Sequence, residues 1–301
     1  MGLVPGVNVG ARAGLLKPPT GPVVDDLPEI YEASSSDAVP TIALVGASGT
    51  GKTEQIRRLI RHLKSKGETA LVVAVESKQQ VISALNPKIL PIQAPGKDGK
   101  SVDVTVKYNR LMTLKNAIRD GRFREDKGVP IGVLCFDGVM EVGDIIKGHH
   151  TKNMPTSQSS GEKNTFALYD RVGVDQIDFL AALREAAGDA AKAFGTRPLG
   201  MVVTCGEEFR NGEFRPILPG NMAPIRFPYQ FELVLRLAVE EGVYVAYTKP
   251  GTVYTPVQGS WNAKAPDIFG DTRIVNPDLG EIYEKVLAYY QDSTRNEAQG
   301  A

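Results

Sequence analysis

The sequence is poor in cysteine and in aromatic residues, and its charges of opposite sign balance. Its two cysteines, Cys135 and Cys205, both lie inside apolar runs, where a thiol behaves as a small buried hydrophobe, so a disulfide framework is excluded. Lys plus Arg and Asp plus Glu number 35 each. The chain as a whole therefore creates no strong electrostatic field that would attract a polyanion. Any contact with nucleic acid has to come from a local basic patch.

Long hydrophobic runs are also missing. No stretch of 18 or more apolar residues occurs, and the N-terminus lacks a charged region followed by an apolar one, so we expect neither a membrane span nor a signal peptide. Hydrophobic residues nevertheless make up 42% of the 301 residues, enough for a sizeable core. These features predict a cytoplasmic globular protein.

A change of composition near residue 40 indicates the domain boundaries. Residues 1–39 are rich in Gly, Pro, Ser and Asp and have few periodic apolar positions, which is typical of a flexible arm or of a segment that orders against a neighbouring subunit. Residues 40–292 are predicted to form one domain, and residues 293–301 a flexible C-terminal tail.

The domain shows strands alternating with helices. Four short runs rich in Val and Ile have the composition of strands buried on both faces: 41–45, 70–75, 131–136 and 199–205. Amphipathic helices are predicted after the first run and over 174–193, and two alternating runs around "EEG" at 240–242 predict an antiparallel hairpin. This pattern predicts a three-layer α/β fold with a mainly parallel central sheet that the C-terminal hairpin extends.

A glycine-rich turn separates the first strand from the first helix. Gly46, Gly51, Lys52 and Thr53 fit the pattern G-x-x-x-x-G-K-[ST] in the strand-turn-helix context that a phosphate-binding loop requires. Successive backbone N–H groups and the helix N-terminus then face phosphate oxygens, Lys52 reaches the β- and γ-phosphates, and the Thr53 hydroxyl ligates Mg²⁺. The predicted nucleotide-binding residues, for ATP with Mg²⁺, are Gly46, Ala47, Ser48, Gly49, Thr50, Gly51, Lys52, Thr53 and Glu54.

Hydrolysis needs further polar groups at the ends of neighbouring strands. Asp137 ends the third run and is the predicted second magnesium ligand; the alternative is a strand-capping Asp that starts a turn with Gly138. Glu76 ends the second run and is placed to polarise the attacking water, unless it is a solvated acid at a strand exit. Thr204, at the end of the fourth run, is a candidate sensor of the γ-phosphate or simply a good strand former.

In their order, these segments resemble the RecA-like branch of P-loop ATPases, and within it the phage-type ATP-binding proteins related to single-strand-annealing recombinases. The resemblance covers residues from about 40 to 290. It is carried by "GASGTGKT", "VAVES", "CFDGVMEV", "FALYDRVGVDQIDFLAALREA", "GMVVTC" and "RPILPGNMAPIRFPYQFELVLRL".

The resemblance implies a RecA-like sheet, ATP hydrolysis with Glu76 as the water activator, and action on single-stranded DNA, in a host cytoplasm if a phage encodes the chain. RecA-like proteins assemble into rings or filaments in which a basic residue of the next subunit completes the ATP site, and Lys249, at the end of the predicted hairpin, is the candidate. One position departs from the family, because Gly138 stands where a hydroxyl residue is often found.

Two polar segments are candidates for contact with DNA or a partner. Residues 147–164 are predicted to form a long loop with three lysines and two histidines, and residues 206–228 a loop that carries Arg210, Arg215 and Arg226. Phe209 and Phe214 are candidates for base stacking or for burial. His149 and His150 lack Cys or acidic partners at ligand spacing, so no zinc site is predicted.

Three functions are consistent with the sequence. The first is an ATPase coupled to single-stranded DNA in phage-type recombination or replication. The second is a nucleotide-binding assembly or packaging component of a phage particle, which the arm of residues 1–39 would suit. The third is a P-loop kinase that transfers the γ-phosphate to a small acceptor. Such a kinase needs an arginine-rich lid over its site, and the sequence shows no compact lid of that kind.

Overall fold

The four buried runs form neighbouring parallel strands of one large sheet. A computed structural model describes residues 40–75, 85, 87–95, 101–153, 165–253, 259–270 and 272–299, all within a unit that spans residues 34–301. In this part of the chain the sheet has the order β13-β10-β9-β1-β6-β5-β2-β3, and β4 pairs with Val129 and Pro130 at the start of β5. The strands are β1 (Thr41–Val45), β2 (Thr69–Ala74), β3 (Lys88–Pro91), β4 (Glu125–Asp126), β5 (Val129–Asp137), β6 (Gly200–Cys205), β9 (Leu233–Glu240), β10 (Val243–Tyr247) and β13 (Arg273–Val275).

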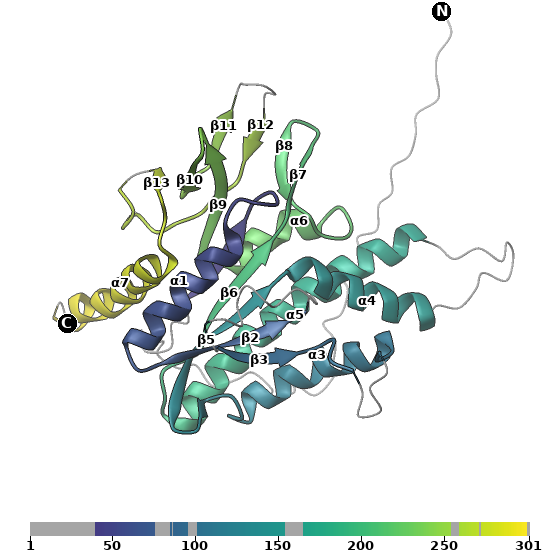
Figure 1. Cartoon of the computed structure of the whole chain (residues 1–301), viewed down its shortest axis with the longest axis horizontal. Helices are drawn as coiled ribbons and strands as arrows, with labels where there is room; N and C mark the ends of the chain where they lie inside the picture. The colour runs from purple at the N-terminus through teal and green to yellow at the C-terminus, as the bar shows by residue number, and fades with distance from the viewer. Residues whose placement is uncertain are drawn as a thin grey trace, which may run out of the picture. The chain divides into compact units, whose positions relative to one another are not determined.

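Helices cover both faces of this sheet (Figure 1). On one face, α1 (Lys52–Ser65) packs beside α7 (Leu279–Gln299) against Ile42 and Leu44 of β1. On the other face lie α3 (Val104–Arg119), α4 (Val139–Asn153) and α5 (Thr165–Phe194), packed against Ala43 and Val45. Alternate side chains of β1 thus pack into two hydrophobic cores, one on each face of the sheet. The predicted three-layer α/β class is confirmed.

The C-terminal hairpin is also confirmed. β9 runs parallel to β1, and β10 returns antiparallel to β9 through a two-residue turn. Glu241 and Gly242 both have positive φ, at 50° and 81°, which is the conformation of a type I′ turn and the reason that glycine suits the second position. β13 extends the sheet beyond β10.

A smaller mixed sheet takes up part of the segment that was predicted to be a loop, residues 206–228. Within residues 206–228, β7 (Glu207–Arg210) and β8 (Glu213–Pro216) form a hairpin, followed by α6 (Ala223–Arg226) and the 3₁₀ turn η2 (Phe227–Gln230). β8 pairs with β12 (Gly259–Trp261), and β12 with β11 (Gly251–Val253). The loop prediction was wrong because Asn211-Gly212, with φ of 53° and 79°, is itself a hairpin turn.

The predicted polar loop over 147–164 is also corrected in part. α4 continues through Asn153, so residues 147–153 are helical, and residues 154–164 lie outside the described residues. Similarly, α7 continues to Gln299, through most of the segment assigned to the C-terminal tail. The predicted arm of residues 1–39 falls outside the described residues. None of the described helices combines the length and apolarity that a bilayer span requires.

Candidate nucleotide site

The glycine-rich turn curls between the end of β1 and the start of α1. It is anchored at its base, where Gly46 N–H donates to the carbonyl of Cys205 at 3.2 Å. A Cβ on Gly46 would lie 2.5 Å from the carbonyl oxygen of Leu237 and 2.6 Å from Oγ1 of Thr50, so only glycine fits there. Gly49 and Gly51 have φ of 82° and 86°, the left-handed conformation that favours glycine.

The cationic group of Lys52 lies across this turn. Its Nζ donates to the carbonyl oxygens of Gly46 and Ala47 at 2.6 and 2.7 Å. Ala47, Ser48 and Gly49 are exposed, so the outer part of the loop faces solvent while its base is held by the sheet. The arrangement holds a positive charge and the N-terminus of a 14-residue helix at the same loop.

Three side chains from three different elements meet beside the loop. The Thr53 hydroxyl in the first turn of α1 donates to Asp137 Oδ2 at 3.2 Å, and the Thr204 hydroxyl at the end of β6 donates to Asp137 Oδ1 at 2.9 Å. Thr204 also accepts a hydrogen bond from Gly138 N–H at 2.8 Å. The buried Thr204 therefore orients the Asp137 carboxylate toward Thr53, a role that the strand pattern alone does not reveal.

This oxygen cluster fits a hard cation. A hydroxyl and a carboxylate are ligand types that Mg²⁺ accepts, and Mg²⁺ usually completes its shell with phosphate and water oxygens rather than with protein groups alone. Ala47, Ser48 and Gly49 leave the outer side of the loop open to a phosphate, and the left-handed conformation of Gly49 and Gly51 lets the backbone curl around it. The residues present therefore fit both Mg²⁺ and the nucleotide phosphates that the sequence predicts.

The remaining predicted site residues lie differently. Glu54 faces the arginines of its own helix, with Arg57 at 2.6 Å and Arg61 at 3.3 Å. Lys249 follows β10, which β9 separates from β1, and its Nζ lies 3.8 Å from Asp267 Oδ1. Its role at the ATP site of a neighbouring subunit stays a prediction. Glu76 lies outside the described residues, and Ala74, two positions before it, pairs in register with Asp137.

An ion pair that sequence reasoning missed joins the loop region to the smaller sheet. Arg236 donates from Nε and Nη2 to the two carboxylate oxygens of Glu207 at 2.7 and 3.0 Å, and both side chains are almost fully buried. The guanidinium also lies over the rings of Phe214 and Trp261, 4.3 and 4.7 Å from their centroids. The sequence signal for this pair is the Arg inside the otherwise apolar strand "LVLRLAV", because a buried charged residue needs a partner.

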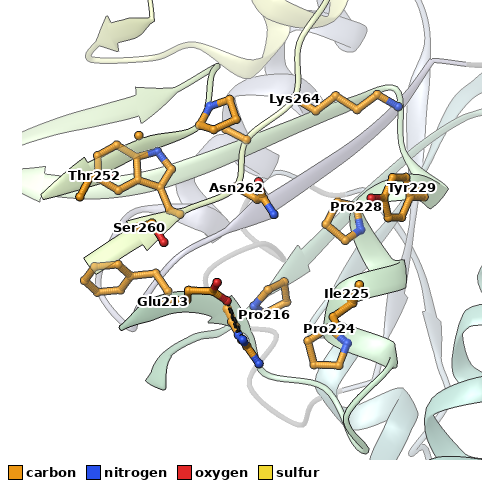
Figure 2. A pocket seen from close by; sticks show the side chains of 16 residues that line it. Glu213, Pro216, Pro224, Ile225, Pro228, Tyr229, Thr252, Ser260, Asn262 and Lys264 are labelled. Atoms are coloured by element: carbon orange, nitrogen blue, oxygen red, sulfur yellow. Dashed lines mark hydrogen bonds and ion pairs between the residues drawn. The ribbon is translucent and has the colours of Figure 1, made fainter. Parts of the chain in front are cut away.

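A groove lies between this smaller sheet and α6 with η2 (Figure 2). Its volume is about 570 Å³, and we call it the proline groove because four of the residues that line it are prolines. Tyr229 is 74% exposed beside it, and Arg215 and Lys264 are its basic lining residues. The prolines are Pro216, Pro224, Pro228 and Pro250, and Trp261 also lines the groove.

The other predicted contact residues are found on the surface or in local pairs. Arg210 and Arg226 are exposed, and Arg215 forms an ion pair with Glu213 at 2.6 Å. Phe209 and Phe214 pack on each other with centroids 5.0 Å apart, and Phe209 remains partly exposed.

The two histidines lie in α4 and interact with neighbouring helices. His149 stacks on Tyr108 with ring centroids 3.9 Å apart, and His150 Nε2 lies 2.6 Å from Asp175 Oδ2.

Both cysteines are buried, as predicted. Burial raises the pKa of the Cys135 and Cys205 thiols far above the ordinary value. A thiol with so high a pKa stays protonated, so Cys205 acts beside the loop as a small apolar residue whose carbonyl anchors Gly46.

Comparison with known proteins adds one partial similarity. Residues 32–78 match a family model described as the type IV secretion-system coupling protein DNA-binding domain. The matched segment contains β1, the glycine-rich loop, α1 and β2, and it indicates a relation to P-loop NTPases. No curated protein matches the chain.

Proposed function

We propose that this protein is a Mg²⁺-dependent ATPase that works with single-stranded DNA in phage-type recombination or replication, as a ring or filament of identical subunits. The observation that carries the proposal is the meeting of Thr53, Asp137 and Thr204 beside a glycine-rich loop that Lys52 closes. A strand, a loop and a helix supply the phosphate-binding groups, and two neighbouring strand ends supply the groups on the metal side.

Each residue of the cluster has a defined task. Loop N–H groups and Lys52 bind the β- and γ-phosphates, and Thr53 with Asp137 holds Mg²⁺, which when bound offsets the charge on the phosphates. Thr204 fixes the rotamer of Asp137 through its 2.9 Å hydrogen bond.

Glu76 is the proposed base for hydrolysis. It accepts a proton from the attacking water, whose oxygen bonds to the γ-phosphorus while the bond to the β–γ bridging oxygen breaks and ADP departs with its electron pair. The proton then passes from Glu76 to solvent or to the released phosphate, which restores the carboxylate.

The proline groove is the proposed contact with single-stranded DNA. The exposed ring of Tyr229 offers a surface on which a base can stack. Lys264, whose Nζ donates to the Phe231 carbonyl at 2.9 Å, and Arg215, which pairs with Glu213 in the groove wall, supply positive charge for the phosphate backbone. The matched family model is described as DNA-binding, which supports a nucleic-acid partner. The Arg236–Glu207 pair, covered by Phe214 and Trp261, links the wall of this groove to the strand beside the phosphate loop.

A second candidate is a nucleotide-driven assembly or packaging component. The similarity of residues 32–78 to the DNA-binding domain of type IV secretion-system coupling proteins favours it. The third candidate, a small-molecule kinase, has no observation in its favour.

The test is phosphate release from ATP with and without single-stranded DNA. For the parent we expect turnover that single-stranded DNA increases; Lys52→Ala loses binding and turnover, and Glu76→Gln keeps binding but turns over slowly. Lys66→Ala, at the far end of α1, is the matched control and keeps parental turnover. Stimulation by double-stranded DNA alone would favour the packaging function, and transfer of phosphate to a small acceptor would favour the kinase.

A further inference from the structure

The tip of the β9–β10 hairpin projects past the end of β1. Val45, the last residue of β1, pairs with Arg236, and β9 continues for four more residues to Glu240. Tyr244 pairs with Val239 in this overhanging part. Because Leu235 and Leu237 belong to the core under α1, the alternation along β9 places Val239 and its partner Tyr244 on the same side of the sheet as α1.

Tyr244 lies directly against the phosphate loop. A Cβ on Gly51, the residue that caps α1, would lie 3.2 and 3.3 Å from Cδ1 and Cε1 of the tyrosine ring. Tyr244 as a residue is nevertheless 45% exposed, and Val239 opposite it is exposed to a similar degree. An apolar surface with an aromatic ring therefore borders the loop without belonging to either core cluster.

The order of the strands indicates in which direction the ribose and base of a bound nucleotide extend from its phosphates. Asp137 is the last residue of β5 and Thr204 the penultimate residue of β6, and both strands lie on one side of β1. Tyr244 belongs to β10, on the other side of β1 beyond β9. A triphosphate whose terminal phosphates and Mg²⁺ lie toward Asp137 extends its ribose and base away from that carboxylate. The opposite side of the loop is where the ring of Tyr244 lies.

We infer that Tyr244 is the platform on which the nucleobase stacks, an inference that rests on the proposed nucleotide site. Every base offers a π-face, so an exposed ring beside the loop binds the base by stacking and excludes water from one of its faces. Stacking requires no hydrogen bond from Tyr244 to the base, and the ring alone is therefore sufficient.

Isothermal titration calorimetry with two ligands separates this role from simple support of the loop. The parent, Tyr244→Ala and Tyr244→Phe are titrated with ATP and with inorganic triphosphate, each with Mg²⁺. Tyr289→Ala serves as the matched control, because Tyr289 is a tyrosine of α7 with 42% exposure. We expect Tyr244→Ala to weaken ATP binding roughly ten- to a hundredfold while the affinity for inorganic triphosphate stays at the parental value. Tyr244→Phe and Tyr289→Ala bind both ligands like the parent.

Other results would overturn the inference in distinguishable ways. Equal losses for ATP and inorganic triphosphate in Tyr244→Ala would show that the ring only supports the loop, and unchanged affinity for both would show that it does not touch the base. In either case the nucleotide site itself stands. A parent that binds neither ligand would instead contradict the proposed function.

Discussion

Arg236 and Glu207 form a two-point ion pair at the junction between the phosphate loop and the smaller sheet, with N···O distances of 2.7 and 3.0 Å. Arg236 pairs in register with Val45 at the end of β1, and Glu207 follows Cys205, whose carbonyl anchors Gly46, by two residues. The pair therefore fixes β7, which begins at Glu207, relative to the strands on either side of the loop.

Removal of one partner should destabilise the fold strongly. Arg236→Ala leaves the Glu207 carboxylate buried without its cation, and we expect a loss of about 3–5 kcal/mol in the free energy of unfolding. Arg273→Ala breaks the ion pair to Glu240 on the exposed part of the same sheet and should cost less than about 1 kcal/mol. Denaturant unfolding measures both, and equal small losses would show that the buried pair is not a structural junction.

Two glycines of the loop should respond differently to alanine. Gly46→Ala places a methyl group 2.5 Å from the Leu237 carbonyl oxygen, so the base of the loop has to move and nucleotide binding should be lost. Gly49→Ala meets nothing within 4 Å and should cost only the strain of its left-handed conformation, about 1 kcal/mol, with binding largely kept. Calorimetry with Mg²⁺ and ATP compares them, and circular dichroism confirms that both variants are folded; loss of binding in Gly49→Ala alone would contradict the geometry.

Thr204 should act on magnesium through Asp137. Thr204→Val removes the hydroxyl that bridges Gly138 N–H and Asp137 Oδ1, and the concentration of Mg²⁺ needed for ATP binding should rise roughly tenfold or more. Thr204→Ser keeps the hydroxyl and should behave like the parent. A parental Mg²⁺ requirement in Thr204→Val would leave Thr204 as a strand residue without influence on the metal.

The stability of the fold should depend on pH through Glu232. Burial raises the pKa of this carboxyl above its ordinary value of 4.5, although the Thr41 backbone N–H donates to it. A raised pKa means that the folded state binds the proton more tightly than the unfolded state, so stability is lost as the pH rises through the folded pKa. Glu232→Gln should therefore melt at a higher temperature than the parent at pH 7, with the difference shrinking as the pH falls toward 4.5. An unchanged difference across that range would contradict the assignment to Glu232.

Local patterns predicted most of the large sheet, because strands buried on both faces are continuous apolar runs. β1 coincides with the predicted run over 41–45, and β2, β5 and β6 differ from their runs only at the ends. The hairpin was predictable from its turn at Glu241 and Gly242. The sequence pattern also brought Thr53 and Asp137 into one site, since parallel strands present their carboxyl ends at one edge of the sheet.

Pairings between distant segments were not predictable in the same way. The Arg236–Glu207 pair joins residues 29 positions apart in two different sheets, and no local spacing indicates it. The contact of Tyr244 with Gly51 depends on how far β9 continues beyond β1, which the alternation of residues does not fix. The second sheet was missed because its strands are short and polar, although Asn211-Gly212 marked the turn.

The dependence of ATP affinity on Mg²⁺ in the parent and in Asp137→Asn tests the central claim most directly. Asp144→Asn, which changes an exposed carboxylate of α4, is the control. If Thr53 and Asp137 hold Mg²⁺ against a triphosphate in the loop, Mg²⁺ should tighten ATP binding about tenfold or more in the parent and in the control, and have little effect in Asp137→Asn. The same Mg²⁺ dependence in all three proteins, or no ATP binding by the parent, would contradict the account.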